Sequence, residues 1–168
     1  AKSLGNYAFW HCDSLREILL SDTLNLVPEY CFSDSDQLAS VTFGSGLKMI
    51  DTHAFYDCDG LLSVRLPEGI MTVGEYAFSS CDALNYVHTG GLPQIEGNTF
   101  NQCSALKTLD VSGAENIMWN AFTSCSALEE ITFGPKLRYC YPYAFEYCEN
   151  VTRMHISDVA AWCAVLTS

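Results

Sequence analysis

A nine-residue pattern repeats along the chain and constrains its fold more than any other feature. The clearest copy runs from Tyr76 to Leu84 and reads Tyr-Ala-Phe-Ser-Ser-Cys-Asp-Ala-Leu. Its phenylalanine recurs at intervals of 22 or 23 residues, at Phe9, Phe32, Phe55, Phe78, Phe100, Phe122 and Phe145. Self-similarity at a fixed period of this length is the signature of a solenoid, in which each repeat forms one coil. The repeat therefore predicts the architecture before any local propensity is considered.

Apolar residues hold fixed positions around each phenylalanine, at five residues before it and at six, nine and eleven residues after it. The last positions alternate with polar ones, as in residues 63–66, which indicates a short strand with its apolar side inward. A second short extended stretch is expected at residues 70–73 and its equivalents. The segment around each phenylalanine is expected to form a compact corner with one turn of 3₁₀ or α character. Since one coil cannot bury its own apolar face, stacked coils must share the core.

Six of the nine cysteines occupy a single repeat position, three residues after the phenylalanine, where the second copy has Ser35. These are Cys12, Cys58, Cys81, Cys103, Cys125 and Cys148. We interpret them as a structural row, with each thiol donating weakly to a backbone carbonyl at the corner. Stacked cysteines are close enough for disulfides, but a repeated structural role explains a repeated position better. The sequence has no Cys-x-x-Cys pair, so no zinc site is expected.

The pattern changes after residue 157. Ser157-Asp158 is a helix N-cap signal, and the apolar run behind it predicts a short helix. We therefore divide the chain into a repeat array at residues 1–157 and a helical cap, or the start of a following segment, at residues 158–168. Trp162 would close the end of the stack. The chain starts at Ala1, partway through a repeat, and is expected to be a piece of a longer protein. Its bare N-terminal edge could support end-to-end self-association.

Charge and motifs exclude several function classes. The formal net charge is −12, from 20 acidic against 8 basic residues, which argues against nucleic acid or an anionic membrane as a partner. No run of 18 apolar residues occurs, so no membrane insertion is expected. There is no phosphate-binding glycine loop, no His-Glu-x-x-His and no Gly-x-Ser-x-Gly. The corner aspartates lack a calcium-ligand spacing. We expect no enzyme activity, no catalytic residue, no metal site and no cofactor.

The segment Val73-Gly74-Glu75-Tyr76-Ala77-Phe78-Ser79-Ser80-Cys81, followed by Leu84 and Val87, resembles the BspA-like leucine-rich repeat. The resemblance covers residues 4 to 157. It implies an α/β leucine-rich-repeat solenoid that is β-rich, with about seven coils of 22–23 residues, short 3₁₀ or helical corners and a short C-terminal helix. It also implies a cell-surface or secreted protein of bacterial type that takes part in adhesion, without catalytic residues. Departures from the repeat indicate local irregularity at residues 89–99.

A binding surface is expected where the sequence does not repeat. Strand alternation sends the residues that flank each inward Ile or Val to the concave face, and the central candidates are Arg65, Tyr86, His88 and Asp110. Tyrosine and arginine are the residues that most often anchor interfaces. An ordinary solvated sheet face is the alternative. The favoured hypothesis is a recognition module for a host or matrix protein or a glycan. The other hypothesis is a structural spacer without a ligand of its own.

Overall fold

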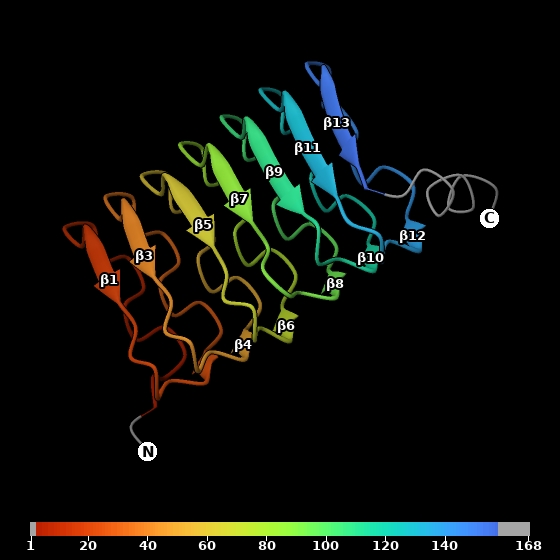
Figure 1. Cartoon of the computed structure of the whole chain (residues 1–168). Helices are drawn as coiled ribbons and strands as arrows, with labels where there is room; N and C mark the ends of the chain where they lie inside the picture. Colours follow the sequence, from red (N-terminus) through yellow and green to blue (C-terminus); the bar gives the residue numbers. More distant parts are fainter. Residues whose placement is uncertain (1–2, 158–168) are drawn as a thin grey trace.

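The computed structural model describes residues 3–157 of the chain, which wind into a solenoid with parallel strands (Figure 1). Each turn carries one long and one short strand. The long strands are β1 (Glu17–Leu19), β3 (Ser40–Thr42), β5 (Ser63–Arg65), β7 (Tyr86–His88), β9 (Thr108–Val111), β11 (Glu130–Phe133) and β13 (Arg153–Ile156). The short strands are β2 (Leu26–Val27), β4 (Met49–Ile50), β6 (Thr72–Val73), β8 (Gln94–Ile95), β10 (Asn116–Ile117) and β12 (Tyr139–Cys140).

Strands of adjacent turns pair in parallel and in the register of the repeat, so that Val64 lies beside Val87, and Val87 beside Leu109. The long strands form a two-stranded sheet, β1-β3, and a five-stranded sheet from β5 to β13. The short strands form two three-stranded sheets, which are interrupted between β6 and β8. The irregularity predicted at residues 89–99 is therefore confirmed on the short-strand side. The long strands β5, β7 and β9 continue past it without a break.

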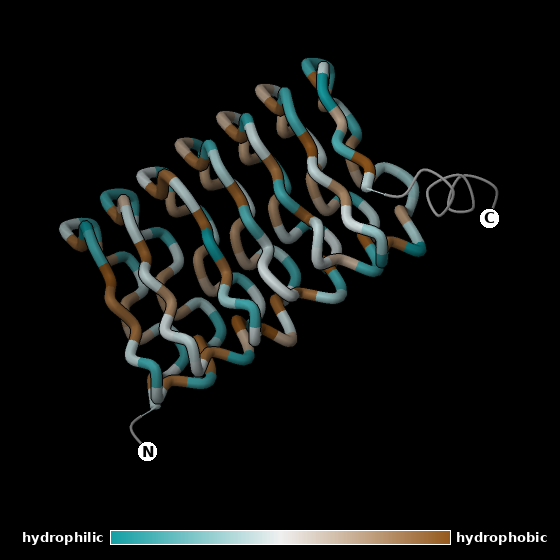
Figure 2. The backbone as a smooth tube through the Cα atoms, viewed as in Figure 1, coloured by the Kyte–Doolittle hydropathy of each residue, from teal (hydrophilic) through white to brown (hydrophobic). Residues whose placement is uncertain are grey.

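A ladder of phenylalanine rings forms the centre of the core. The rings from Phe9 to Phe145 stack on their neighbours with centroids 5.1–5.3 Å apart and interplanar angles of at most 13°. The five rings between the terminal two are at most 2% exposed. Apolar and polar residues alternate around every coil (Figure 2). Each coil thus contributes one layer to a continuous core, as the spacing of the phenylalanines predicts.

The corners differ from the prediction, because they are tight turns rather than 3₁₀ or α-helical segments. The residues two before and two after each phenylalanine have positive φ, between 52° and 64°, and none of them is glycine. A left-handed residue ends any run of right-handed helical dihedrals. The corner N–H groups also bond to the next coil, as Phe32 N–H does to the Ala54 carbonyl at 2.9 Å. Both features prevent a helix from forming at the corners.

Two further parts of the predicted fold class need correction. No helix occurs within residues 3–157, so the α/β description is wrong for this part of the chain, which is a β solenoid. The array has about six complete turns instead of about seven. A complete turn contains one long strand and the short strand that follows it, from β1 and β2 to β11 and β12, and β13 begins the next turn. The helix expected at residues 158–168, with Trp162, lies outside the described residues. The domain division at residue 157 stays a prediction.

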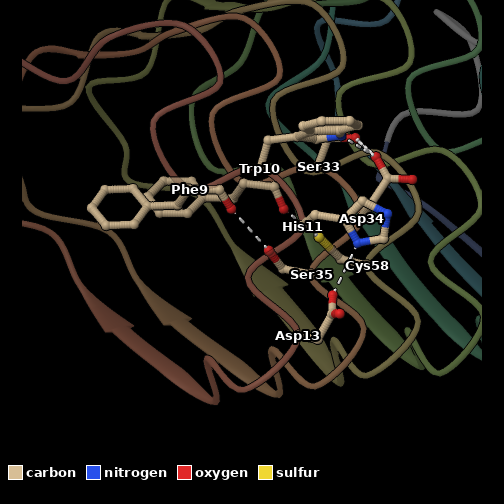
Figure 3. A network of polar contacts seen from close by, with 9 residues as sticks. Phe9, Trp10, His11, Asp13, Ser33, Asp34, Ser35 and Cys58 are labelled. Carbon is tan, nitrogen blue, oxygen red and sulfur yellow. Dashed lines mark hydrogen bonds and ion pairs between the residues drawn. The ribbon is translucent and has the colours of Figure 1, made fainter.

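The cysteine row has the structural role that its repetition predicts. Each thiol from Cys58 onward donates to the carbonyl of the phenylalanine one coil earlier, at 3.2–3.3 Å. Ser35 substitutes its hydroxyl and donates to the Phe9 carbonyl at 3.2 Å (Figure 3). The cysteines at described positions are free thiols. Burial raises the pKa of the Cys58 and Cys103 thiols to about 12, so both stay protonated and able to donate.

Candidate recognition surface

The outward side chains of the long strands form one surface, which we call the strand face. It comprises Glu17, Leu19, Ser40, Thr42, Ser63, Arg65, Tyr86, His88, Thr108, Asp110, Glu130, Thr132, Arg153 and His155. The sequence-predicted residues lie at its middle, on β5, β7 and β9. The parallel register places His88 between Arg65 and Asp110 on the adjacent strands. The four candidates are therefore direct or diagonal neighbours in the sheet.

Arg65 and Tyr86 contact each other diagonally across β5 and β7. The Arg65 guanidinium donates a hydrogen bond to the Tyr86 hydroxyl at 3.3 Å, and its central carbon lies 5.2 Å from the ring centroid. A cation at this distance is attracted by an aromatic ring, by about 0.5–1 kcal/mol at an exposed site. Arg65 is exposed and Tyr86 is half-buried. The pair therefore offers a flat, partly oriented surface to a partner.

His88 and Asp110 form the second pair, and a third residue joins them. His88 Nδ1 lies 2.8 Å from Asp110 Oδ2, and His88 Nε2 lies 3.7 Å from Glu68 Oε1. The side chains of His88 and Asp110 are only 19% and 27% exposed, whereas that of Glu68 is 83% exposed. The imidazole thus lies between a partly buried carboxylate and an exposed one.

The carboxylate of Asp110 is also held from its own strand end, where the Ser112 N–H donates to Oδ1 at 3.0 Å. Burial acts to raise the pKa of Asp110, but the hydrogen bonds from Ser112 and His88 outweigh it and hold the pKa below the ordinary value. Asp110 is therefore a charged acceptor at neutral pH. A fixed charge in a half-buried place is suited to orient a ligand, and here it also fixes the ring of His88.

A second ionic group lies on the strand face nearer β13. Glu130 contacts Arg153 Nη2 at 3.1 Å through Oε2 and His155 Nε2 at 2.8 Å through Oε1. Sequence reasoning placed these residues on the face without selecting them. It missed Glu68 and Ser112 entirely. Both lie just beyond a strand, where Glu68 reaches His88 in the neighbouring turn and Ser112 bonds back to Asp110 in its own turn. A comparison of equivalent repeat positions gives no signal for such contacts.

Two exposed tryptophans lie away from the strand face, at corners where the repeat does not specify the residue. Trp10 is 51% exposed, and its indole N–H donates to Asp34 Oδ2 at 2.8 Å (Figure 3). Trp119 is 43% exposed, and its ring lies so close to Gly97 that an added Cβ there would be 3.1 Å from Trp119 Cε2. Each ring therefore packs on the adjacent coil and also presents surface to a partner.

The surface lacks features of other site types within the part of the chain that the structure describes. No group of three or more His, Cys, Asp or Glu side chains is arranged to hold a metal ion in residues 3–157. Over the same residues, no helix has the length and apolar character needed to cross a membrane. The side chains of the His88–Asp110 pair contact Glu68 and Ser112, and no cysteine is among these contacts. Its geometry suits polar recognition.

The family model that matches is the BspA-type leucine-rich repeat region, in six copies over residues 2–114 and 87–161. No curated protein sequence matches the chain. Among solved structures, the fold is similar to a leucine-rich repeat protein of T. pallidum, with a TM-score of 0.78 and 25% identity over 88% of this chain and 70% of that one. A leucine-rich repeat protein from Bacteroides ovatus gives 0.76 and 25% over 92% of this chain and 46% of that one.

A third leucine-rich repeat protein, from Eubacterium ventriosum, also gives a TM-score of 0.76 and 25% identity, over 84% of this chain and 38% of its own. The chain therefore spans about two thirds of the first of these structures and less than half of the other two. The predicted resemblance is confirmed by the family model and by these folds.

Proposed function

Because the chain belongs to the BspA-type leucine-rich repeat family, we propose that it is a non-catalytic recognition module that binds a protein partner through the centre of its strand face. Arrays of this kind generally serve as protein-interaction or structural modules, and their extended surfaces are suited to large partners. The array of this chain gives one such surface, on which seven long strands present side chains that differ from turn to turn.

The contact network of Arg65, Tyr86, His88 and Asp110 is the observation that supports this site most directly. Tyrosine and arginine are enriched among residues that dominate binding energy, and here they are already in contact. His88 and Asp110 are fixed by hydrogen bonds on two sides. Side chains that are ordered before binding lose less conformational freedom when a partner arrives. The centre of the face is thus better prepared for binding than its serine- and threonine-rich N-terminal part.

A catalytic role is disfavoured by the environment of the thiols. Reactive cysteines are partly exposed, with a lowered pKa. In the inner part of the cysteine row, by contrast, Cys58 and Cys103 are fully buried with pKa values raised to about 12. Cys148 in the last corner is partly exposed, and a hydrogen bond with the Cys125 thiol lowers its pKa, but its thiol donates to the Phe122 and Glu146 carbonyls and not to a histidine. These thiols donate to carbonyls at the corners, whereas His88 lies on the long-strand side. We further assign the module to the cell surface or to the secreted fraction, on the strength of the family resemblance alone.

The test is a screen of the intact chain against host, matrix and glycan arrays, followed by affinity measurement on the best binder. Tyr86→Ala and Arg65→Ala should each weaken binding about 5- to 30-fold, as loss of a dominant interface side chain does. Tyr139→Ala and Arg138→Ala are matched controls, since both residues are exposed but lie at the short-strand side, and they should leave affinity unchanged.

Three outcomes would contradict the proposal in different ways. Equal affinity of the Tyr86 and control variants would move the site off the strand face. Binding to glycans alone would replace the protein partner with a carbohydrate. No binding to any array member would favour the structural spacer.

A further inference from the structure

The contacts of His88 leave one of its ring nitrogens as an unused acceptor. The Asp110 carboxylate can only accept hydrogen bonds, so its contact of 2.8 Å with His88 Nδ1 requires that this nitrogen carry the proton. In the neutral imidazole the other nitrogen, Nε2, is then an acceptor. It lies 3.7 Å from Glu68 Oε1, which is also an acceptor, and this distance is too long for a hydrogen bond. Within residues 3–157, the two acceptors thus lie side by side without a donor between them.

The Glu68 carboxylate is a charge without a compensating partner. Its side chain is exposed, and among residues 3–157 it contacts only His88. The same repeat position in the next two coils is occupied by Gly91 and Gly113, both partly exposed. The close approach of the coils requires glycine at position 91, since an added Cβ would clash with the Glu68 carbonyl oxygen. No side chain therefore extends from this position of the next two coils to cover or neutralise the carboxylate.

A second histidine on the strand face shows the same kind of contact with its cation in place. His155 occupies the repeat position of His88, and its Nε2 lies 2.8 Å from Glu130 Oε1. Glu130 is also paired with Arg153, whose Nη2 lies 3.1 Å from Oε2. The carboxylate near β13 thus has an arginine of its own chain, which Glu68 lacks.

Arg65 does not supply this missing cation. It is in register with His88, but its guanidinium donates to the Tyr86 hydroxyl at 3.3 Å and lies 5.2 Å from the centre of the Tyr86 ring. Within residues 3–157, Arg65 forms no ion pair with Glu68. The formal net charge of −12 also favours the approach of a basic partner. Charge complementarity at the centre of the strand face therefore calls for a cation from outside the chain.

We propose that the partner of the strand face places a basic side chain, an arginine in preference to a lysine, between Glu68 and His88 Nε2. This inference rests on the proposed function, because the site is the centre of the same face, and it names the chemistry of the partner. A guanidinium presents several N–H donors in a planar fork, so one group can donate to the Glu68 carboxylate and to Nε2 together.

The contact requires a neutral imidazole, so acid pH opposes it. A second proton on His88 repels the cation and turns Nε2 into a donor toward Glu68. The charged groups around the ring act on that proton in both directions, since Asp110 and Glu68 favour it and Arg65 disfavours it.

The experiment follows the imidazole signals of the 168-residue chain by NMR while a capped Gly-Arg-Gly peptide is added at pH 8. The matched probe is the same peptide with citrulline, which keeps the shape of arginine without its charge. The arginine peptide should shift the His88 signal in a saturable way, and the citrulline peptide should bind at least about fivefold more weakly. The His155 signal should not move, because its Nε2 already contacts Glu130. At pH 5 the shift of His88 should be lost.

Two variants complete the test. Glu68→Gln removes the charge and should weaken binding of the arginine peptide about three- to fivefold. Glu75→Gln is the matched control, because Glu75 is exposed but follows the short strand β6, and it should leave binding unchanged. Since both carboxylates are exposed, neither variant should change the thermal transition.

Equal shifts with the two peptides, or equal binding by the two variants, would overturn the inference. The proposed function would still stand in that case if Tyr86→Ala weakens binding of a partner found on the arrays. The reverse result, a partner that binds without regard to Tyr86 beside a specific arginine shift at His88, would remove the proposed function and keep the cation site.

Discussion

Phe78 and His88 lie in the same turn of the solenoid, yet they belong to columns of opposite kinds. Phe78 stacks between Phe55 and Phe100, so the same residue type occurs above and below it. His88 lies in register between Arg65 and Asp110, three different side chains at one repeat position. In the corner column, the same residue type in every turn favours stability, because identical rings stack at one nearly constant spacing. The strand-face column has no such requirement, because its side chains point outward.

The difference separates stability from recognition along a single chain. At the corners, rings, thiols and backbone groups make the same contacts in successive turns, and these contacts carry the core. On the strand face, a substitution changes local charge or shape without removing a layer of the core. Recognition can therefore change along the array while the corners stay constant. Substitutions in the corner column should therefore affect stability more than substitutions on the strand face.

Phe78→Ala should be the most destabilising change. The ring is fully buried between two others, and its removal leaves a cavity that the stack cannot close, which costs about 3–5 kcal/mol in the free energy of unfolding. Phe9→Ala is the matched comparison at an end of the ladder, where the ring is 39% exposed, and should cost about 1–2 kcal/mol. Chemical denaturation measures both. Equal losses would show that the ladder is not the core of the array.

Alkaline pH should weaken the corners through the buried thiols. The pKa of Cys103 is raised from 9.0 to about 12 by burial, so the folded state keeps a proton that the unfolded state loses. Its contribution is fully present below pH 9 and is lost as pH rises toward 12, by at most about 1.4 kcal/mol per pH unit for one thiol. Stability should be measured from pH 8 to 11.

Cys103→Ser is the control for this effect, since Ser35 occupies the same repeat position in the second copy and donates the same hydrogen bond. The variant should lose less stability over the alkaline range than the parent chain. Identical pH profiles would mean that other groups, such as tyrosines, govern the alkaline loss, and that the thiol row does not contribute.

Arg65→Ala should have the smallest effect on stability. Arg65 is exposed and its contacts are a long hydrogen bond and one ring contact with Tyr86, so the loss should stay below about 1 kcal/mol. Thermal denaturation beside Phe78→Ala gives the comparison directly. A loss as large as that of the phenylalanine variant would show that the strand face also holds the array together.

The sequence predicts most of this fold because the repeat samples the same environment seven times. The phenylalanine ladder and the thiol-to-carbonyl bonds follow from positions that recur, and both are confirmed. The corner conformation could not be read in this way. Tyr76 and Ser80 adopt positive φ without being glycine, so composition gives no sign of it. The corner N–H groups are satisfied by the next coil, which local propensity does not consider.

The candidate surface was predictable in part for the same reason. Alternation places Arg65, Tyr86, His88 and Asp110 on one face, and the structure brings them into two contacting pairs. The alternation pattern does not reveal Glu68, which follows Pro67 in a turn and approaches His88 from another coil. Contacts between unlike repeat positions depend on how far a side chain reaches after the strand ends. That reach is a property of the folded turn.

The cysteine column gives every corner except the second, which has Ser35 at this position, its own chemical reporter. Because one thiol of the column belongs to each of the other corners, alkylation of a buried cysteine requires that its coil open locally. Cys12 and Cys148, in the first and last corners, are partly exposed, whereas Cys81 and Cys103 are fully buried. Timed alkylation read by mass spectrometry would therefore follow fraying inward from both ends, coil by coil, without an added probe.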